Sequence, residues 1–234
     1  MPRPAPLLAL LLFTSIGAPR IRAQDFQTWN EIDFAATWHR IDWLAPALAR
    51  VDTERPNPQL AATGIMADVH LPGNLTLTAG YLFVDLPPYS TQAHVPLIAV
   101  SGLFKVGRVA ISDRNRFERL FGLGDLGRHA GLGNSPVRYR NRLLLDLPLS
   151  TDNRWHLFAD DEVFYDFEVS RWNQNRVQGG GGMHLSKRLL LDIFFLQQNI
   201  SVPSRQIQVV GSTFRVDLTA RRQPDNPHLA KSVR

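Results

Sequence analysis

The sequence predicts an all-β protein, an antiparallel up-and-down β-barrel of the outer-membrane type with about 10–12 strands. Three observations lead to this fold class. Apolar and polar residues alternate with a period of two along most of the chain. The alternating segments are about 9–13 residues long, a length that crosses a bilayer at a tilt. Charged residues occupy one parity of several segments, so those strands have one charged face and one apolar face.

The charged parity is clearest in residues 112–120 and 138–145, where two arginines and a glutamate, and then three arginines, fall on one parity. In the second segment, Tyr139, Leu143 and Leu145 take the other parity. Residues 159–165 supply carboxylates on one parity, and residues 174–182 supply a further arginine. An ionised group cannot be left unpaired against hydrocarbon, so the charged face is predicted to line the barrel interior, or lumen. The predicted lumen charge cluster comprises Arg114, Arg116, Glu118, Arg138, Arg140, Arg142, Asp160, Glu162 and Arg176.

Residues 1–23 are predicted to form a secretory signal peptide. Arg3 precedes the short apolar run 7–13, and small residues lead to Ala23, which is followed by polar residues. A basic start, a short apolar core and a small residue at the cleavage site are typical of such a signal, and the run is too short to span a bilayer as a helix. We expect cleavage after Ala23, with Ala18 as the alternative site.

Length and composition predict one domain, because 234 residues suffice for one sizeable all-β unit. The chain has no cysteine, which excludes disulfides, thiolate metal sites and a cysteine nucleophile. The formal net charge of +5 resides at the ends: three arginines belong to the signal and the tail carries a net +3, which leaves the body near −1. Such a body lacks the basic stripe of a nucleic-acid-binding protein. Residues 24–218 are the predicted barrel domain, and residues 219–234 a disordered basic tail.

The first four strands are predicted from alternation and from turns. Ile32 and Phe34 alternate with polar residues in the first, and aromatic residues lie near its ends. Pro46 weakens the prediction of the second as a central strand, because proline cannot donate to the ladder. Pro72-Gly73-Asn74 predicts a hairpin between the third and fourth, because glycine and asparagine accept positive φ. The predicted strands are residues 28–38, 41–51, 59–71 and 75–86.

Seven further strands follow Pro87-Pro88. Gly107 lies in a tight turn between the first two of them, and residues 123–136 form a long glycine-rich loop before the third. Asp192 interrupts the most apolar stretch, which is therefore a strand and not a membrane helix. These strands are residues 94–105, 112–120, 137–147, 155–167, 172–185, 189–197 and 206–218. Because bacterial single-chain barrels use even strand numbers, we expect an even total.

Five short motifs follow one another along the chain: residues 26–29 (FQTW), 114–118 (RNRFE), 138–142 (RYRNR), 162–165 (EVFY) and 175–176 (NR). This ordered set resembles a bacterial family known as domain of unknown function family 2490. The resemblance implies an exported, outer-membrane-type β-barrel, with no known activity to transfer. This chain departs from the pattern in its long 123–136 loop and in lacking a terminal aromatic residue.

Glycine-rich stretches do not predict a phosphate site. Gly122, Gly124 and Gly127 have the spacing of a dinucleotide fingerprint, but the glycines and Pro136 that follow forbid the helix such a site requires. The run 179–182 lacks the Lys-Ser/Thr pair of a phosphate loop, and it indicates a bend or a close contact in a barrel wall.

No metal, cofactor-binding or catalytic residue is predicted. Asp160, Asp161 and Glu162 lack the spacing of a calcium loop. The seven histidines are scattered, with no two at helical ligand spacing. One alternative remains open, an outer-membrane lipid hydrolase in which the fold brings Ser112, His156 and Asp160 together.

The predicted function is therefore an outer-membrane β-barrel of structural or narrow-channel type. Its charge cluster fills a narrow lumen and sets strand register, or else forms a selectivity lining or an anion site. Outer-membrane lipid and the barrel-assembly machinery are the expected partners, with no nucleic acid. A second alternative is a soluble periplasmic or secreted barrel that binds an apolar ligand, in which Phe117, Leu143 and Leu145 would face inward.

Overall fold

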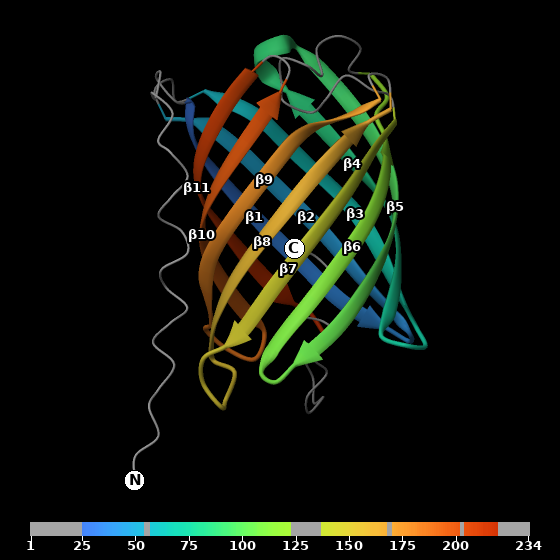
Figure 1. Ribbon diagram of the computed structural model, residues 1–234, viewed down its shortest axis with the longest axis vertical. Helices are drawn as coiled ribbons and strands as arrows, with labels where there is room; N and C mark the ends of the chain where they lie inside the picture. Colours follow the sequence, from blue (N-terminus) through green and yellow to red (C-terminus); the bar gives the residue numbers. More distant parts are fainter. Residues whose placement is uncertain (1–24, 54–56, 123–136, 168–169, 202–203, 220–234) are drawn as a thin grey trace.

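Eleven β-strands make up most of the chain in the computed structural model, which describes residues 25–53, 57–122, 137–167, 170–201 and 204–219 (Figure 1). The predicted signal peptide, loop 123–136 and the tail beyond residue 219 lie outside these residues. The strands are β1 (Asp25–Trp38), β2 (Ile41–Asp52), β3 (Pro58–Leu71), β4 (Leu75–Leu86), β5 (Thr91–Val106), β6 (Val109–Arg119), β7 (Val137–Pro148), β8 (Trp155–Asp166), β9 (Arg171–His184), β10 (Leu189–Ser201) and β11 (Ser204–Asp217), with the 3₁₀ turn η1 (Pro87–Tyr89) before β5.

The strands close into one barrel in sequence order. Successive strands pair antiparallel. The first and last strands, β1 and β11, pair in parallel, in a ladder that begins with Asp25 opposite Ile207 and ends with Ala35 opposite Asp217. The predicted all-β barrel is confirmed, although its closure is not wholly antiparallel. The expected even number is wrong, since the described residues form eleven strands. With an odd count the first and last strands point the same way, so closure requires a parallel ladder.

The two ends of the barrel differ in their connections. At the lower end of Figure 1, His39 and Arg40 join β1 to β2, and similarly tight turns follow β3 and β5. His39, Asn74 and Gly107 adopt φ values of 59°, 60° and 60°, which let the chain reverse within a few residues. We call this the short-turn end and the opposite one the far end. β1 starts at the far end, so every odd-numbered strand runs toward the short-turn end.

Side chains alternate between lumen and outer surface along the strands. In β5, Val95 and Leu97 are buried while Ile98 and Val100 are exposed. Phe117, Leu143 and Leu145 lie on the outer surface with 47%, 46% and 42% exposure, so the inverted face assignment of the soluble alternative is wrong. No helix within the described residues is long and apolar enough to span a membrane, a criterion that does not bear on strands.

Glycines of β9 make room for side chains that meet across that strand. Gly182 pairs with His156 of β8 on one side and with Asp192 of β10 on the other. His156 Nε2 lies 2.9 Å from Asp192 Oδ1, directly over the glycine. A Cβ atom on Gly182 would lie 1.9 Å from that oxygen and 2.2 Å from that nitrogen. This is the close wall contact that the glycine run indicates.

Replacing Gly182 by alanine is expected to separate His156 from Asp192 and lower the unfolding free energy by about 1–3 kcal/mol, as in other overpacked interiors. The measurement is urea unfolding of the purified protein. Gly179→Ala is the matched control, because its nearest neighbour, Phe158 O, would lie 3.9 Å from the added Cβ. Equal stability of the two variants would show that the His156–Asp192 contact contributes nothing.

Candidate functional site

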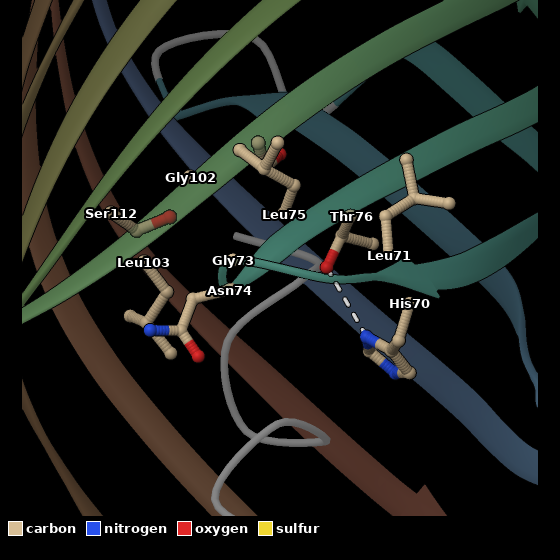
Figure 2. Close-up of a pocket in the computed structure, with 10 residues that line it drawn as sticks. His70, Leu71, Gly73, Asn74, Leu75, Thr76, Gly102, Leu103 and Ser112 are labelled. Carbon is tan, nitrogen blue, oxygen red and sulfur yellow. Dashed lines mark hydrogen bonds between the residues drawn. The ribbon is translucent and has the colours of Figure 1, made fainter.

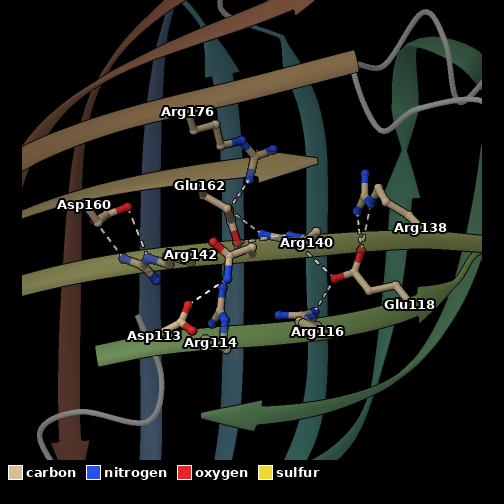
Figure 3. A network of polar contacts seen from close by, with 11 residues as sticks. Asp113, Arg114, Arg116, Glu118, Arg138, Arg140, Arg142, Asp160, Glu162 and Arg176 are labelled. Atoms are coloured by element: carbon tan, nitrogen blue, oxygen red, sulfur yellow. Dashed lines mark hydrogen bonds and ion pairs between the residues drawn. The ribbon is translucent and has the colours of Figure 1, made fainter. Parts of the chain in front are cut away.

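The nine predicted lumen charges all face one cavity, from the adjacent strands β6, β7, β8 and β9 (Figure 3). The period-two spacing of these residues puts them on a single face of each strand. Every ion-paired side chain among them keeps at most 12% exposure. We call this group the charged wall: Arg114, Arg116, Glu118, Arg138, Arg140, Arg142, Asp160, Glu162 and Arg176.

Glu118 is one of two carboxylates around which the charged wall is organised. Arg138 donates to its Oε2 from Nε at 3.0 Å and, more closely, from Nη2. Arg140 Nη1 donates to Oε1 at 2.7 Å. Arg116 Nη2 also lies 2.7 Å from Oε1, as an ion pair without the alignment of a hydrogen bond. Three guanidinium groups therefore share one carboxylate that is itself buried.

Glu162 is the second such carboxylate. Arg140 donates two hydrogen bonds to it, from Nε to Oε1 at 3.1 Å and from Nη2 to Oε2 at 2.7 Å. Arg114 Nη2 donates to Oε1 at 2.8 Å, and Arg176 Nη1 lies 3.6 Å from Oε2. Arg140 thus connects Glu118 of β6 with Glu162 of β8. Charge-assisted bonds of this kind are roughly twice as strong as neutral ones and fix geometry as well as charge.

The strand register explains why Arg140 and Arg142 pair with carboxylates that lie diagonally across the strands. Arg114 is directly opposite Arg142, and Arg116 is directly opposite Arg140, in the β6–β7 ladder. Like charges that face each other across strands are destabilising. Arg142 is compensated by Asp160, to which Nε and Nη2 donate at 3.1 and 2.9 Å.

Two aromatic rings support the arginines. Phe164 lies under Arg140 and Arg176, whose guanidinium carbons are 4.6 and 4.7 Å from the ring centroid. Trp29 of β1 contacts both Arg176 and Arg50 of β2, whose guanidinium carbons are 5.2 and 3.7 Å from the ring centroid. Such contacts stabilise a cation that water does not reach. Arg50, Trp29 and Phe164 were not predicted site residues, because Arg50 lies outside the strands with alternating arginines and the two rings carry no charge.

The neighbouring strands β3, β4 and β5 present hydrocarbon to the same lumen, which the charge pattern did not predict. The charged wall and this surface line one cavity of about 230 Å³. The sequence feature that could have predicted this apolar surface is the presence of apolar residues on both parities of β4 and β5, as at Leu82, Phe83 and Val84. We call the inward residues the apolar wall: Leu60, Ala62, Leu82, Val84, Val95 and Leu97.

Carboxylates and histidines occupy the lumen near the short-turn end. His70 Nε2 lies 2.7 Å from Asp42 Oδ2, and its Nδ1 is 3.2 Å from Thr76 Oγ1. A second cavity of about 210 Å³ lies here beside the β3–β4 hairpin (Figure 2). Thr78 donates to Asp68 at 2.5 Å on the same side. The lumen is therefore rich in arginine toward the far end and acidic toward the short-turn end. This separation of charge creates an electric field along the barrel axis.

The geometry does not assemble the proposed Ser112, His156 and Asp160 set. Asp160 binds Arg142, and His156 binds Asp192. Ser112 lines the cavity beside His70 at the short-turn end. The described residues contain no cluster of three or more histidine, aspartate or glutamate side chains arranged to hold a metal ion.

The model of a family described as "Protein of unknown function (DUF2490)" matches residues 26–209, a span from the start of β1 into β11 that includes the whole charged wall. A search of the curated proteins finds no match.

Proposed function

The chain belongs to the DUF2490 family of proteins of unknown function, and from that premise we propose that it is an outer-membrane β-barrel of structural or narrow-channel type. The proposal includes export by the signal peptide at residues 1–23. It also includes folding into the outer membrane by the barrel-assembly machinery, with lipid as the surrounding partner.

The observation that carries the proposal is the apolar outer surface of a barrel whose lumen is charged. Large hydrophobic side chains are exposed around the wall, for example Ile65 at 51%, Ile98 at 51% and Ile193 at 57%. In water such surface costs roughly 25 cal/mol per Å², so a monomer rarely exposes it in large contiguous patches. A bilayer removes this cost. An outer-membrane barrel combines such an apolar band with a polar interior.

Aromatic side chains at two levels of the outer wall support the same placement. Trp38 and Trp155, 65% and 48% exposed, lie near the short-turn end. Toward the far end, Tyr139, Tyr165 and Trp172 pack together, with ring centroids 5.4–6.0 Å from Trp172. Aromatic girdles at both interfaces are a feature of membrane barrels.

A few polar side chains on the outer wall satisfy one another, as a lipid-facing surface requires. Asn141 Nδ2 donates to Asp113 Oδ1 at 2.6 Å, and Asn115 Nδ2 donates to Asp113 Oδ2 at 3.2 Å. Asn175 donates to Asp161 in the same way. Within a bilayer these strand-to-strand bonds offset part of the cost of burying polar groups.

The buried charge network of the lumen favours a structural barrel or a narrow conduit over a wide pore. The two carboxylates at the centre of the charged wall have side chains only 1% and 6% exposed. A permeating ion has to pass between paired guanidinium and carboxylate groups, which is how charged rings select ions in narrow channels.

The test is fractionation of cells that express the full chain, followed by gel mobility with and without boiling. We expect the protein in the outer-membrane fraction and a band that shifts on heating, because a closed barrel resists detergent until it is heated. A soluble periplasmic protein that needs no detergent would contradict the proposal. The fold would stand in that case, and only the location would be wrong.

A further inference from the structure

The geometry points to a binding site in the lumen: we propose that the cavity between the charged wall and the apolar wall binds a single-chain amphiphile with an anionic headgroup. This site lies between walls of the barrel itself, so it does not depend on the compartment in which the barrel resides.

The charge balance of the cavity favours an anion. Seven arginines and five carboxylates line it, so the lining carries a formal excess of two positive charges. In the charged wall itself, six arginines share three carboxylates. Buried like charges without compensation are costly, and a ligand that brings negative charge into the cavity offsets that cost.

Arg116 of the charged wall has hydrogen-bonding capacity left over. Arg116 lines the cavity and is 6% exposed. Its Nε has no acceptor among the described residues, and its Nη2 meets Glu118 without hydrogen-bond alignment. Buried donors of this kind are rare because they forfeit their hydration without replacement. Arg116 therefore brings to the cavity lining a positive charge that its protein neighbours bond incompletely, and an anionic headgroup in the cavity would pair with that charge.

The apolar wall makes an alkyl chain the complement of that headgroup. Leu82 and Ala62 are partly buried and line the cavity over a core that includes Leu60, Val84 and Val95. Small inorganic anions would leave this hydrocarbon in contact with water, whereas an alkyl chain covers it. The volume of about 230 Å³ is below the roughly 300–1,000 Å³ of pockets for drug-sized ligands. A single chain of medium length is therefore the expected occupant.

The experiment uses decanoate as the probe and the full mature chain in phosphatidylcholine nanodiscs, with empty nanodiscs to subtract partitioning into lipid. We expect isothermal titration calorimetry to give one saturable decanoate site per barrel. Acetate, which has the headgroup without the chain, should bind at least about tenfold more weakly. Decyltrimethylammonium, which has the chain with the opposite charge, should show no saturable binding. If fractionation instead finds a soluble protein, the same titration is made in buffer.

Two variants locate the site. Arg116→Gln should weaken decanoate binding about tenfold, the effect of losing a charge-assisted hydrogen bond. Arg205→Gln is the control, since Arg205 pairs with Asp25 and neither residue lines the cavity. This variant should bind decanoate as tightly as the unmodified protein does. Heat-shifted gel mobility verifies that each variant folds. Equal binding of decanoate and decyltrimethylammonium would overturn the proposal, as would acetate binding as tight as that of decanoate. The ligand series on the unmodified protein decides the matter even if Arg116→Gln does not fold.

Discussion

Replacing Arg140 by leucine is expected to lower the unfolding free energy by about 3–5 kcal/mol, the usual effect of removing one partner from a buried ion pair. Arg140 is the only residue of the charged wall whose described ion pairs reach both Glu118 and Glu162. Leucine leaves both carboxylates with fewer donors in a site that water barely reaches. Their remaining arginines moderate the loss, so we expect a value in the lower part of this range. Urea unfolding of the refolded protein gives the measurement.

Two matched variants isolate the cause. Arg140→Lys keeps the charge but loses the planar fork that reaches two carboxylates at once, so it should be intermediate in stability. Arg205→Leu removes an ion pair whose partners are 32% and 38% exposed, and such pairs contribute about 0–1 kcal/mol. If Arg140→Leu assembles normally and changes only the conductance measured in a planar bilayer, Arg140 serves ion passage and not the fold.

The strands could be predicted because period-two alternation is a local property. Residues 41–51 were predicted where β2 runs Ile41–Asp52, and residues 172–185 where β9 runs Arg171–His184. The same period assigned the charged residues to one face. Alternation cannot reveal register, however. That Arg116 faces Arg140, with Glu118 and Glu162 on the diagonals, follows only from how β6, β7 and β8 are aligned.

Contacts that cross an intervening strand also could not be predicted. His156 and Asp192 are 36 residues apart and meet only because Gly182 of β9 lies between them without a side chain. The apolar wall was missed for a different reason. The prediction of a charged lumen came from the alternating charges of β6–β9 alone, whereas β4 and β5 have apolar residues on both parities, so only part of the circumference is charged. The parallel β1–β11 closure was missed because the even-number rule for bacterial barrels was applied to this chain.

The outer face offers the second large effect, because a charge costs more at the centre of a bilayer than at its surface. Ile65 lies near the middle of β3 and points outward with 51% exposure. Ile65→Arg is expected to lower the unfolding free energy by about 2–4 kcal/mol in phosphatidylcholine vesicles, the penalty for arginine at the midplane of a membrane barrel.

Leu71 provides the control for depth, since it lies on the same strand and the same face but next to the short-turn end, with 41% exposure. Leu71→Arg should cost only about 0–1 kcal/mol, because near the interface the guanidinium reaches water. In a soluble barrel both positions face water, and surface substitutions there usually change stability by less than about 0.5 kcal/mol. A clear difference between two exposed positions of one strand would therefore have to come from the solvent around the barrel. Small and equal effects at Ile65 and Leu71 would count against the membrane proposal without bearing on the cavity between the charged wall and the apolar wall, since neither side chain lines it.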